Sequence, residues 1–273
     1  MAKTSGIFSL KGKLGDTVHS SNDGVDYSKQ MPKGPINQSD DTKKTATDFG
    51  VASKTASVIF KALEPFVRKY SDGKTISRLT KRLLNVLKTL PKKQIGGKKV
   101  ADGQVSLIAG FEFSRKKSLG SLLYQLPRLI IVENGMVLNF APSTVDRSIK
   151  LKKGATHVVI QSTVAVIDLS LKERPHIIKA RDLTIDLNKD SYKGKKINIS
   201  HPFEGLQLVL LAVGVHYLDG DYRLHNGKFN AATIAQAILL RDGVEVAFVR
   251  SEEEKAKYME QEDEGLEWEE VAP

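Results

Sequence analysis

Asn-Gly and Asp-Gly pairs interrupt this 273-residue chain seven times, and they constrain its fold more than any other feature. Two-residue hairpin turns need positive φ at their central positions, which these residue types adopt readily. Three pairs have arms rich in β-branched and aromatic residues on both sides: Asn134-Gly135, Asp219-Gly220 and Asp242-Gly243. We expect a β-hairpin at each of them, and therefore a largely antiparallel β protein.

The segment around Asp23-Gly24 predicts a weaker hairpin, because its arms are polar on both faces. We expect residues 1–36 to form an edge hairpin or a projecting arm. The preceding "GIFSLKGKLGD" is similar to a nucleotide-binding loop, but five residues separate Gly6 from Gly12, and Leu14 replaces the hydroxyl residue that would bind magnesium. We therefore interpret its glycines as turn residues.

Residues 37–100 carry two helical patterns that we expect to form a basic helical hairpin. The first begins at Ser39, an N-cap residue followed by two aspartates, and Pro65 ends or kinks it. Its apolar positions recur mostly every three or four residues: Ala46, Phe49, Ala52, Ala56, Ile59, Phe60 and Leu63. The second helix follows Asp72-Gly73 and stops at Pro91, with apolar positions Ile76, Leu79, Leu83, Val86, Leu87 and Leu90.

The segment "KKQIGGKKVADG" (92–103) predicts a linker and a domain boundary. From 101 to 250 we expect mostly strands, including "QVSLIAGFEF", "HIIKARDLTIDL" and "ATHVVIQSTVAVIDLSL". The last of these places Val158, Ile160, Val164 and Val166, with Ser162, on one face. The fold class is therefore α+β: an N-terminal β-hairpin and a helical hairpin, followed by an antiparallel β-sandwich that we expect to be immunoglobulin-like.

Charge divides the chain into a basic body and an acidic tail. The net charge is +10, but residues 252–273 contain ten acids and two lysines, so the first 251 residues carry +18. The candidates for polyanion binding are Lys74, Arg78, Lys81, Arg82, Lys88, Lys92, Lys93, Lys98, Lys99, Arg115, Lys116 and Lys117. No aromatic residues interleave with them to stack bases. Three alternatives stay open: specific nucleic-acid binding, contact with polyanions or an acidic partner, and a plain solvated surface.

The acidic tail, residues 251–273, carries four candidate anchor residues among its acids: Tyr258, Met259, Leu266 and Trp268. Trp268 is the only tryptophan of the chain, and a purely solvating tail needs none. An acidic segment with aromatic anchors is typical of a docking peptide that becomes ordered on a basic partner. We expect these four residues to dock on the chain's own helical face or on another subunit.

His216 and His225 are weak candidates for a metal site. If Asp219-Gly220 forms the hairpin turn, Arg223 pairs with His216, and the two histidines share one face of the sheet. Two histidines without a further ligand fixed by spacing are too few for a zinc site. Ordinary surface histidines are therefore the favoured interpretation, and we expect no metal.

The sequence offers no constellation for catalysis. It contains no cysteine and no G-x-S-x-G motif, and its scarce carboxylate pairs, Asp182 with Asp186 near Asp168, favour a solvated strand face. We expect a protein that is not an enzyme, with no cofactor and no small-molecule substrate. No signal peptide and no membrane-spanning run is present in the sequence, so we expect a cytoplasmic or virion protein without a membrane partner.

Residues 6–66 resemble a family of uncharacterised Bacteroidota proteins that share a "GKxG" hairpin followed by a helix rich in threonine and lysine. The matching residues are Gly12, Lys13, Gly15, Gly24, Pro32, Thr42, Phe49, Ala52 and Ser53. The resemblance implies no known activity. It is compatible with non-catalytic assembly roles, including those of phage or prophage structural proteins.

Two functional hypotheses follow. The first is a structural or protein-interaction subunit of a larger assembly, a homo-oligomer included, which uses its arm and its acidic tail for contacts between subunits. The alternative is a nucleic-acid-associated protein that binds through the basic helical face and is modulated by the tail.

Overall fold

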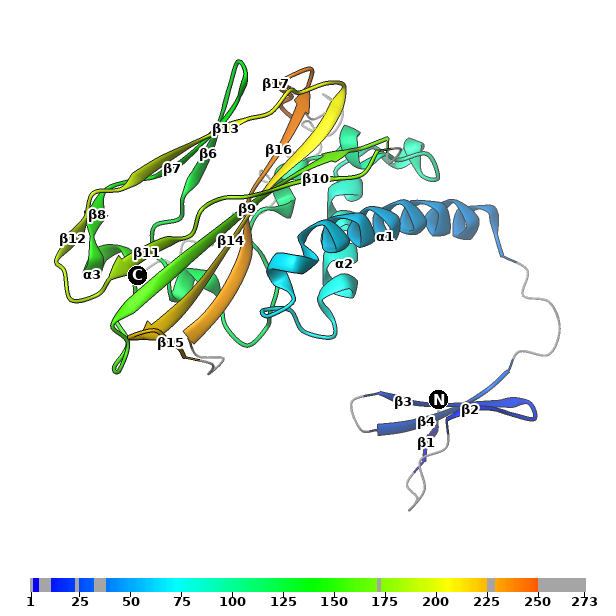
Figure 1. Ribbon diagram of the computed structural model, residues 1–273. Helices are drawn as coiled ribbons and strands as arrows, with labels where there is room; N and C mark the ends of the chain where they lie inside the picture. The colour runs from blue at the N-terminus through cyan, green and yellow to red at the C-terminus, as the bar shows by residue number, and fades with distance from the viewer. Residues whose placement is uncertain are drawn as a thin grey trace, which may run out of the picture. The chain divides into compact units, whose positions relative to one another are not determined.

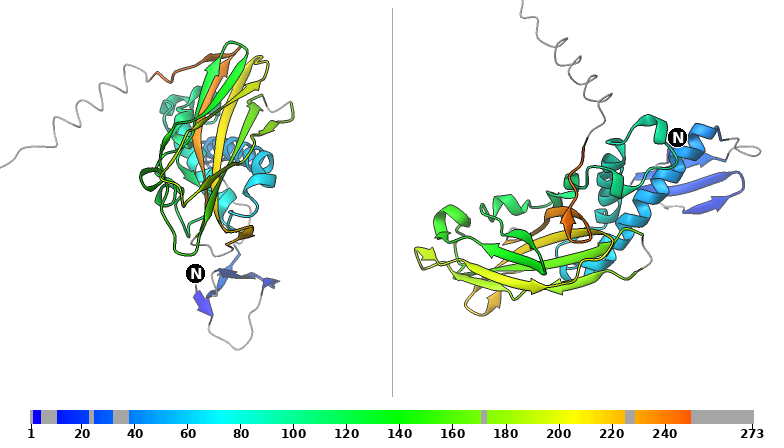
Figure 2. Two further views of the ribbon diagram at one scale, coloured as in Figure 1. Left: turned by 60° about the vertical axis from the view of Figure 1, so that its left-hand side comes forward. Right: turned by 90° about the horizontal axis from the view of Figure 1, so that it is seen from above.

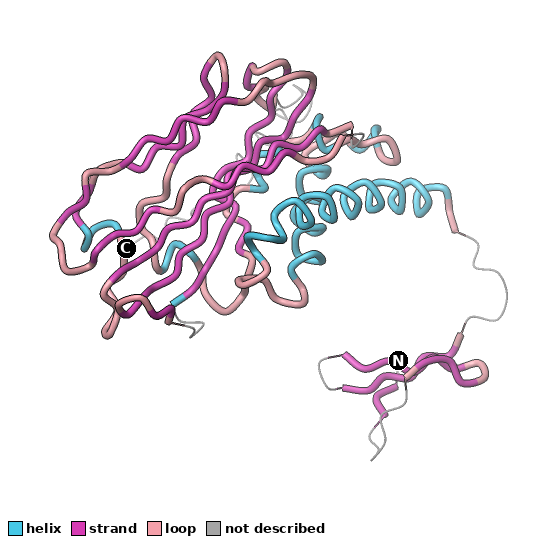
Figure 3. Tube along the Cα trace, in the orientation of Figure 1, coloured by secondary structure: helices cyan, strands magenta, loops and turns pink. Residues whose placement is uncertain are grey.

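The computed structural model describes residues 2–4, 11–22, 25–31, 38–170, 173–224 and 229–249. It shows an α+β protein in which antiparallel strands predominate over helices (Figure 3). Residue contacts divide the chain into an N-terminal unit, Met1–Lys43, and a main unit, Lys44–Pro273. In the part of the chain that the structure describes, no helix is long and apolar enough to cross a membrane. The anchor residues predicted in the acidic tail lie outside the described residues.

The N-terminal unit is a four-stranded antiparallel sheet with the strand order β1-β4-β3-β2. Its strands are β1 (Ala2–Thr4), β2 (Gly12–Leu14), β3 (Thr17–Asn22) and β4 (Val25–Gln30). The pairing of β3 with β4 confirms the expected hairpin, although its turn, Asp23-Gly24, lies outside the described residues. Gly15, in the turn between β2 and β3, has a φ angle of 58°, as its interpretation as a turn residue requires. Gly12 has a φ angle of 111° but is the first residue of β2, paired with His19, so its interpretation as a turn residue is wrong.

Helix α1 (Asp40–Val67) begins where the sequence predicts, with Ser39 Oγ accepting a hydrogen bond from the Thr42 amide at 3.3 Å. Pro65 lies in its last turn, close to the expected end. The buried face starts later than predicted: Phe49 is 53% exposed and Ala46 is exposed as well. From Ala52 onward the predicted apolar positions are buried or half-buried, because only this part of α1 packs on the main sheet.

Helix α2 (Thr75–Lys88) buries Leu79, Leu83, Val86 and Leu87 as expected, while Ile76 is exposed. Both helices contribute to one core, but they do not lie along each other as a hairpin would. Each helix packs its apolar face on the sheet instead. Short helical segments follow: η1 (Lys92–Gln94), η2 (Val100–Asp102), η3 (Val105–Ile108), η4 (Leu119–Ser121) and α3 (Val145–Ser148).

The main sheet has eight antiparallel strands. Its central path is β10-β9-β14-β16-β17, with β11 beside β9, β15 beside β14 and β5 beside β16. The strands are β5 (Phe111–Glu112), β9 (His157–Asp168), β10 (His176–Lys179), β11 (Leu183–Asp186), β14 (Leu206–Asp219), β15 (Tyr222–Arg223), β16 (Asn230–Arg241) and β17 (Val244–Glu245).

A second sheet of three strands has the order β13-β7-β6, and a two-stranded ladder joins β12 to β8. These strands are β6 (Arg128–Val132), β7 (Gly135–Phe140), β8 (Ser143–Thr144), β12 (Ser191–Tyr192) and β13 (Lys195–Ser200).

The main unit has three layers: helices, main sheet and second sheet (Figures 1 and 2). Alternation along β9 sends Val158, Ile160, Val164 and Val166 into the core shared with the second sheet, as the sequence predicts. The opposite face packs on α1 and α2. The two sheets are consistent with a sandwich. Because the helices share a core with the main sheet, the boundary expected at 92–103 does not separate two cores.

All three strongly predicted hairpins form, but two of their turns are displaced by one residue. The turn between β6 and β7 consists of Glu133 and Asn134, with Gly135 already paired, and that between β14 and β15 consists of Gly220 and Asp221. Only Asp242-Gly243 forms its turn as predicted, with φ angles of 50° and 83°.

Two predicted strands are wrong in part. In 104–113 the residues Val105 and Ile108 are buried three positions apart on the turn of η3, so only Phe111–Glu112 joins the sheet. The segment 176–187 forms two strands, β10 and β11, which both pair with β9. Lys179 lies opposite Thr163 and Leu183 opposite Ile160, so one extra residue bulges out between them.

Candidate functional site

Lys98, one of the twelve candidate cations, is buried and holds the end of a helix. Its Nζ donates to the carbonyl oxygens of Leu87 at 2.9 Å and Leu90 at 2.8 Å, at the C-terminal end of α2. These carbonyl groups lack partners inside a helix, and a cation is favoured at this end of the helix dipole. Lys98 is therefore not a surface cation.

Two arginines of the same set fasten α2 to the segment 109–113. Arg78 donates to the carbonyl oxygens of Glu112 (2.6 Å) and Phe113 (3.0 Å), and it forms an ion pair with Asp72 at 3.0 Å. Arg82 donates to the carbonyl oxygen of Ala109 at 2.8 Å. Both residues are half-buried, so of the three open alternatives a plain solvated surface is wrong for these two arginines.

The other nine candidates lie at the surface. Lys117 is half-buried, and the other eight are exposed: Lys74, Lys81, Lys88, Lys92, Lys93, Lys99, Arg115 and Lys116. None of the nine lines either of the two cavities described below. Their binding of a polyanion stays a prediction.

The expected pairing of the metal candidates is wrong. Because the β14–β15 turn is displaced, Arg223 lies opposite Leu218, and His216 lies between Val159 of β9 and Asn230 of β16. His225 lies outside the described residues. Within the described residues no group of three or more His, Cys, Asp or Glu side chains could hold a metal ion.

The predicted carboxylate pair has separate partners. Asp182, at the bulge between β10 and β11, accepts a hydrogen bond from Gln161 Nε2 at 2.6 Å. Asp186 accepts from the Asn188 amide at 3.0 Å, and Asp168 accepts from the Ser170 amide at 2.8 Å. The structure therefore directs only Asp182 toward the main sheet's polar face described next.

Helices α1 and α2 lie on one face of the main sheet (Figure 1). This face changes from apolar to polar side chains near the end of α1. Its apolar part under the helices includes Ala165, Ile167, Leu208, Leu210, Ala212, Ala232 and Ile234. The alternation of the strands continues this face with Thr163 and Gln161 on β9, Gly214 and His216 on β14, and Asn230 on β16. Phe66 and Tyr70 lie on Gly214, where an added Cβ would come within 2.9 Å of each ring.

Gln161 is the centre of a hydrogen-bond cluster on this polar face. Its Oε1 accepts from Lys69 Nζ and, at 3.2 Å, from the Tyr70 hydroxyl, while its Nε2 donates to Asp182 Oδ2. Gln161 is 8% exposed, so these bonds fix its amide in one orientation.

Arg223 extends the cluster toward β16. It donates to Asn230 Oδ1 at 3.1 Å, and its guanidinium carbon lies 5.9 Å from the centroid of the Tyr70 ring. Three buried polar atoms here have no hydrogen-bond partner among the described residues: Asp182 Oδ1, His216 Nδ1 and Arg223 Nε. Ordered water satisfies such atoms in most proteins.

The cluster carries more positive than negative charge, and the pKa values reflect this. Burial, together with the positive charges of Arg223 and Lys69, lowers the pKa of His216 to about 4. Burial also lowers the pKa of Lys69, with Arg223 adding to the effect, and burial raises the pKa of Tyr70. His216 is therefore neutral near pH 7, and within the described part of the cluster Asp182 is the one acid that offsets the cations.

No nucleophile beside a free base occurs in the described cluster, but the arrangement can bind an anion. Sequence reasoning singled out Asp182, His216 and Arg223 for other roles, and it missed Lys69, Tyr70 and Gln161. The available signal was the polar triplet "QST" in the middle of β9, which is otherwise buried and mostly apolar. Such an interruption favours a polar site over a plain core.

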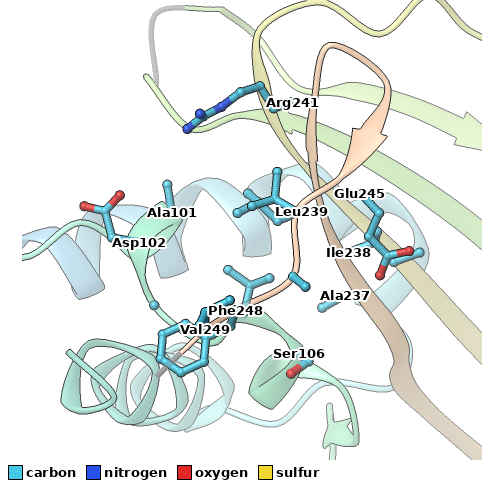
Figure 4. Close-up of a pocket in the computed structure, with 14 residues that line it drawn as sticks. Ala101, Asp102, Ser106, Ala237, Ile238, Leu239, Arg241, Glu245, Phe248 and Val249 are labelled. Atoms are coloured by element: carbon cyan, nitrogen blue, oxygen red, sulfur yellow. The ribbon is translucent and has the colours of Figure 1, made fainter. Parts of the chain in front are cut away.

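Apart from this cluster, a cavity of about 400 Å³ lies where the described chain ends (Figure 4). It is lined by η2, η3, β16 and the segment 245–249, which leads toward the acidic tail. Figure 4 shows its two carboxylates, Asp102 and Glu245, at opposite ends of a row of apolar side chains, with Arg241 pointing away from Glu245. The two carboxylates therefore do not come together, and the cavity offers no carboxylate pair for acid–base chemistry.

Searches of protein-family models, curated proteins and solved structures found no match to this chain.

Proposed function

We propose that this protein is a non-enzymatic structural subunit that assembles through its N-terminal sheet and its acidic tail. The observation that carries the proposal is that none of the side chains described in residues 11–21 and 25–31 is buried. A sheet of three or more strands needs a covered hydrophobic face to be stable. The N-terminal sheet buries no such hydrophobic face among its described side chains, so we expect a partner to cover it.

One face of this sheet combines apolar and positively charged side chains. Strand pairing places Lys13, Val18 and Lys29 side by side across β2, β3 and β4, and alternation adds Tyr27 and Val25 to the same face. Val18 and Val25 are 38% and 37% exposed. The face is therefore suited to a partner that carries both acidic and apolar residues.

The acidic tail of a second copy has this chemistry. Residues 252–273 have a net charge of −8 and include Tyr258, Leu266 and Trp268. Opposite charges steer the association, and the aromatic anchors bury apolar area. Assembly of this kind agrees with the roles that the Bacteroidota resemblance implies, and with a phage or other bacterial assembly. Within this proposal, the immunoglobulin-like topology of the sandwich stays a prediction.

The test is self-association of the full chain, measured by light scattering over a range of concentrations. Truncation after residue 251, and separately Lys13→Glu with Lys29→Glu, should each weaken association about tenfold or more, because both remove the charge complementarity. The matched control is Lys54→Glu with Lys61→Glu, which changes the net charge equally on exposed positions of α1. A chain that stays monomeric while its N-terminal amides resist hydrogen exchange would refute the proposal.

The alternative proposal is that the nine surface cations bind nucleic acid and that the acidic tail weakens this binding. Binding of the full chain to DNA and RNA should then weaken steeply with added salt, and truncation after residue 251 should strengthen it. A response to salt that is flat would exclude this alternative.

A further inference from the structure

A cavity of about 190 Å³ lies between the end of α1 and strands β9 and β10. Its polar lining consists of Gln161 and Thr163 on β9, Lys179 on β10 and Lys69 after α1. Lys179 and Thr163 are direct neighbours across the two strands, and Gln161 follows on the same face. Gln161 is held in place by Lys69 and Asp182. The cavity therefore belongs to a built hydrogen-bond cluster and not to a loose surface groove.

Cations outnumber anions around this cavity. Lys69 and Lys179 line it directly, and Arg223 and Lys179 both act electrostatically on Lys69, whose pKa is lowered chiefly by burial. Among the described residues, Asp182 is the acid whose charge acts on Lys69, and its Oδ2 is already bonded to Gln161. An anion in the cavity would offset the remaining positive charge and support the protonated form of Lys69.

The remaining lining is apolar and limits the kind of anion. Ala62, Pro65 and Phe66 of α1 form one wall, and Ile177 of β10, which is 41% exposed, forms another. A fully hydrated inorganic ion gains nothing from such walls, whereas an apolar group does. Because a cavity of about 150 Å³ accommodates benzene, this one is large enough for a ring that carries one small charged group.

We propose that this cavity binds a small organic carboxylate, with its charged group at Lys69, Lys179 and the Thr163 hydroxyl and its apolar part against Phe66 and Ile177. This site goes beyond the assembly function, and it departs from the sequence-based expectation of no small-molecule ligand. It uses none of the residues of the N-terminal sheet or the tail, so either proposal can fail alone.

Benzoate is a suitable probe, and benzyl alcohol is a neutral control of similar shape. Titration of the full chain, followed by the methyl resonances of Ile177, should give a saturable shift with benzoate. The shift should need about ten times more benzyl alcohol, if it occurs at all, and added salt should weaken the response to benzoate. Equal responses to the two compounds, or no saturation with benzoate, would overturn the proposal.

The variant that tests the cations is Lys69→Gln with Lys179→Gln, both at exposed residues. Because Lys69 also donates to Gln161, thermal unfolding of the variant beside wild type checks that the fold is retained. It should bind benzoate at least about tenfold more weakly, whereas Lys61→Gln, on an exposed part of α1 outside the cavity, should bind as wild type does. Retained affinity in the double variant refutes the site. A synthetic peptide of residues 251–273 that shifts Ile177 when benzoate does not would assign the cavity to an acidic peptide instead.

Discussion

Replacing Lys98 tests whether this lysine belongs to the fold or to a basic surface. Lys98→Met keeps most of the aliphatic side chain in its buried place but removes the ammonium that donates to the Leu87 and Leu90 carbonyl oxygens. The Leu87 oxygen keeps a hydrogen bond from the Leu90 amide at 3.3 Å. The Leu90 oxygen has no other donor among the described residues, so the variant leaves it without a partner.

The expected loss of stability is large for one side chain. A hydrogen bond to a charged group contributes about 1.5–3 kcal/mol, and an unpaired buried carbonyl costs about 1–3 kcal/mol. Because these two figures partly describe the same loss, we expect a decrease of about 3 kcal/mol in the free energy of unfolding. For a unit of this size that is a decrease of about 6–12 °C in Tm.

The assay is thermal and urea unfolding of Lys98→Met beside Lys99→Met. Lys99 is the exposed neighbour, so its replacement removes the same charge and should change the free energy of unfolding by less than about 0.5 kcal/mol. Equal stability of the two variants would refute the assignment of Lys98 to the end of α2. An unchanged affinity for nucleic acid in Lys98→Met is expected in any case, because the ammonium is buried.

Three further predictions follow from packing and burial. Gly214→Ala should lower the free energy of unfolding by about 1–3 kcal/mol, because its Cβ would lie 2.9 Å from the Phe66 and Tyr70 rings. Gly50→Ala, in α1 with nothing within 4 Å, should raise it by about 1 kcal/mol, so changes of equal sign in thermal unfolding would contradict the packing. His216 titrates at about 4 when folded instead of at 6.5, so the unfolded chain binds more protons between these values, and this residue's contribution to stability declines as the pH falls from 6.5 to 4. The urea midpoint of wild type minus that of His216→Gln should therefore be larger at about pH 7.5 than at about pH 4.5. A difference that stays constant with pH would contradict this prediction. Gln236→Leu should make the Leu129 amide exchange faster by about fivefold or more, because Gln236 Oε1 accepts from that amide at 2.6 Å, and unchanged exchange would contradict this link between the sheets.

The sequence was sufficient for features that depend on local chemistry. Ser39 marked the start of α1, and the leucine spacing after Asp72 marked α2. The Asx-Gly pairs located the strong hairpins because their β-rich arms extend on both sides. Alternation on β9 assigned Val158 and Val164 to one core, since a strand exposes its two faces in turn.

Features that depend on distant residues could not be predicted in the same way. The sequence predicts Gly135 as a turn residue, but an added Cβ there would lie 2.2 Å from the Ile199 carbonyl oxygen of β13, a strand far away in the sequence. The bulge near Asp182 is similar: the local sequence is compatible with one long strand. The extra residue becomes necessary only when β10 and β11 pair with the same neighbour, β9.

The same contrast explains why charge counting misplaced three of the twelve candidate cations and why the polar cluster was overlooked. Lys98, Arg78 and Arg82 look like their exposed neighbours in the sequence, yet each donates to backbone carbonyl oxygens that only the tertiary fold brings within its reach. Gln161 is the opposite case: it matters to the fold, but composition does not reveal it, because one polar residue in a buried strand changes the composition very little. Burying its amide is unfavourable unless all its groups are bonded, and Lys69, Tyr70 and Asp182 meet that requirement. In a chain with a net charge of +10, the informative polar residues are therefore those that interrupt an apolar strand, because each of them needs partners from elsewhere in the fold.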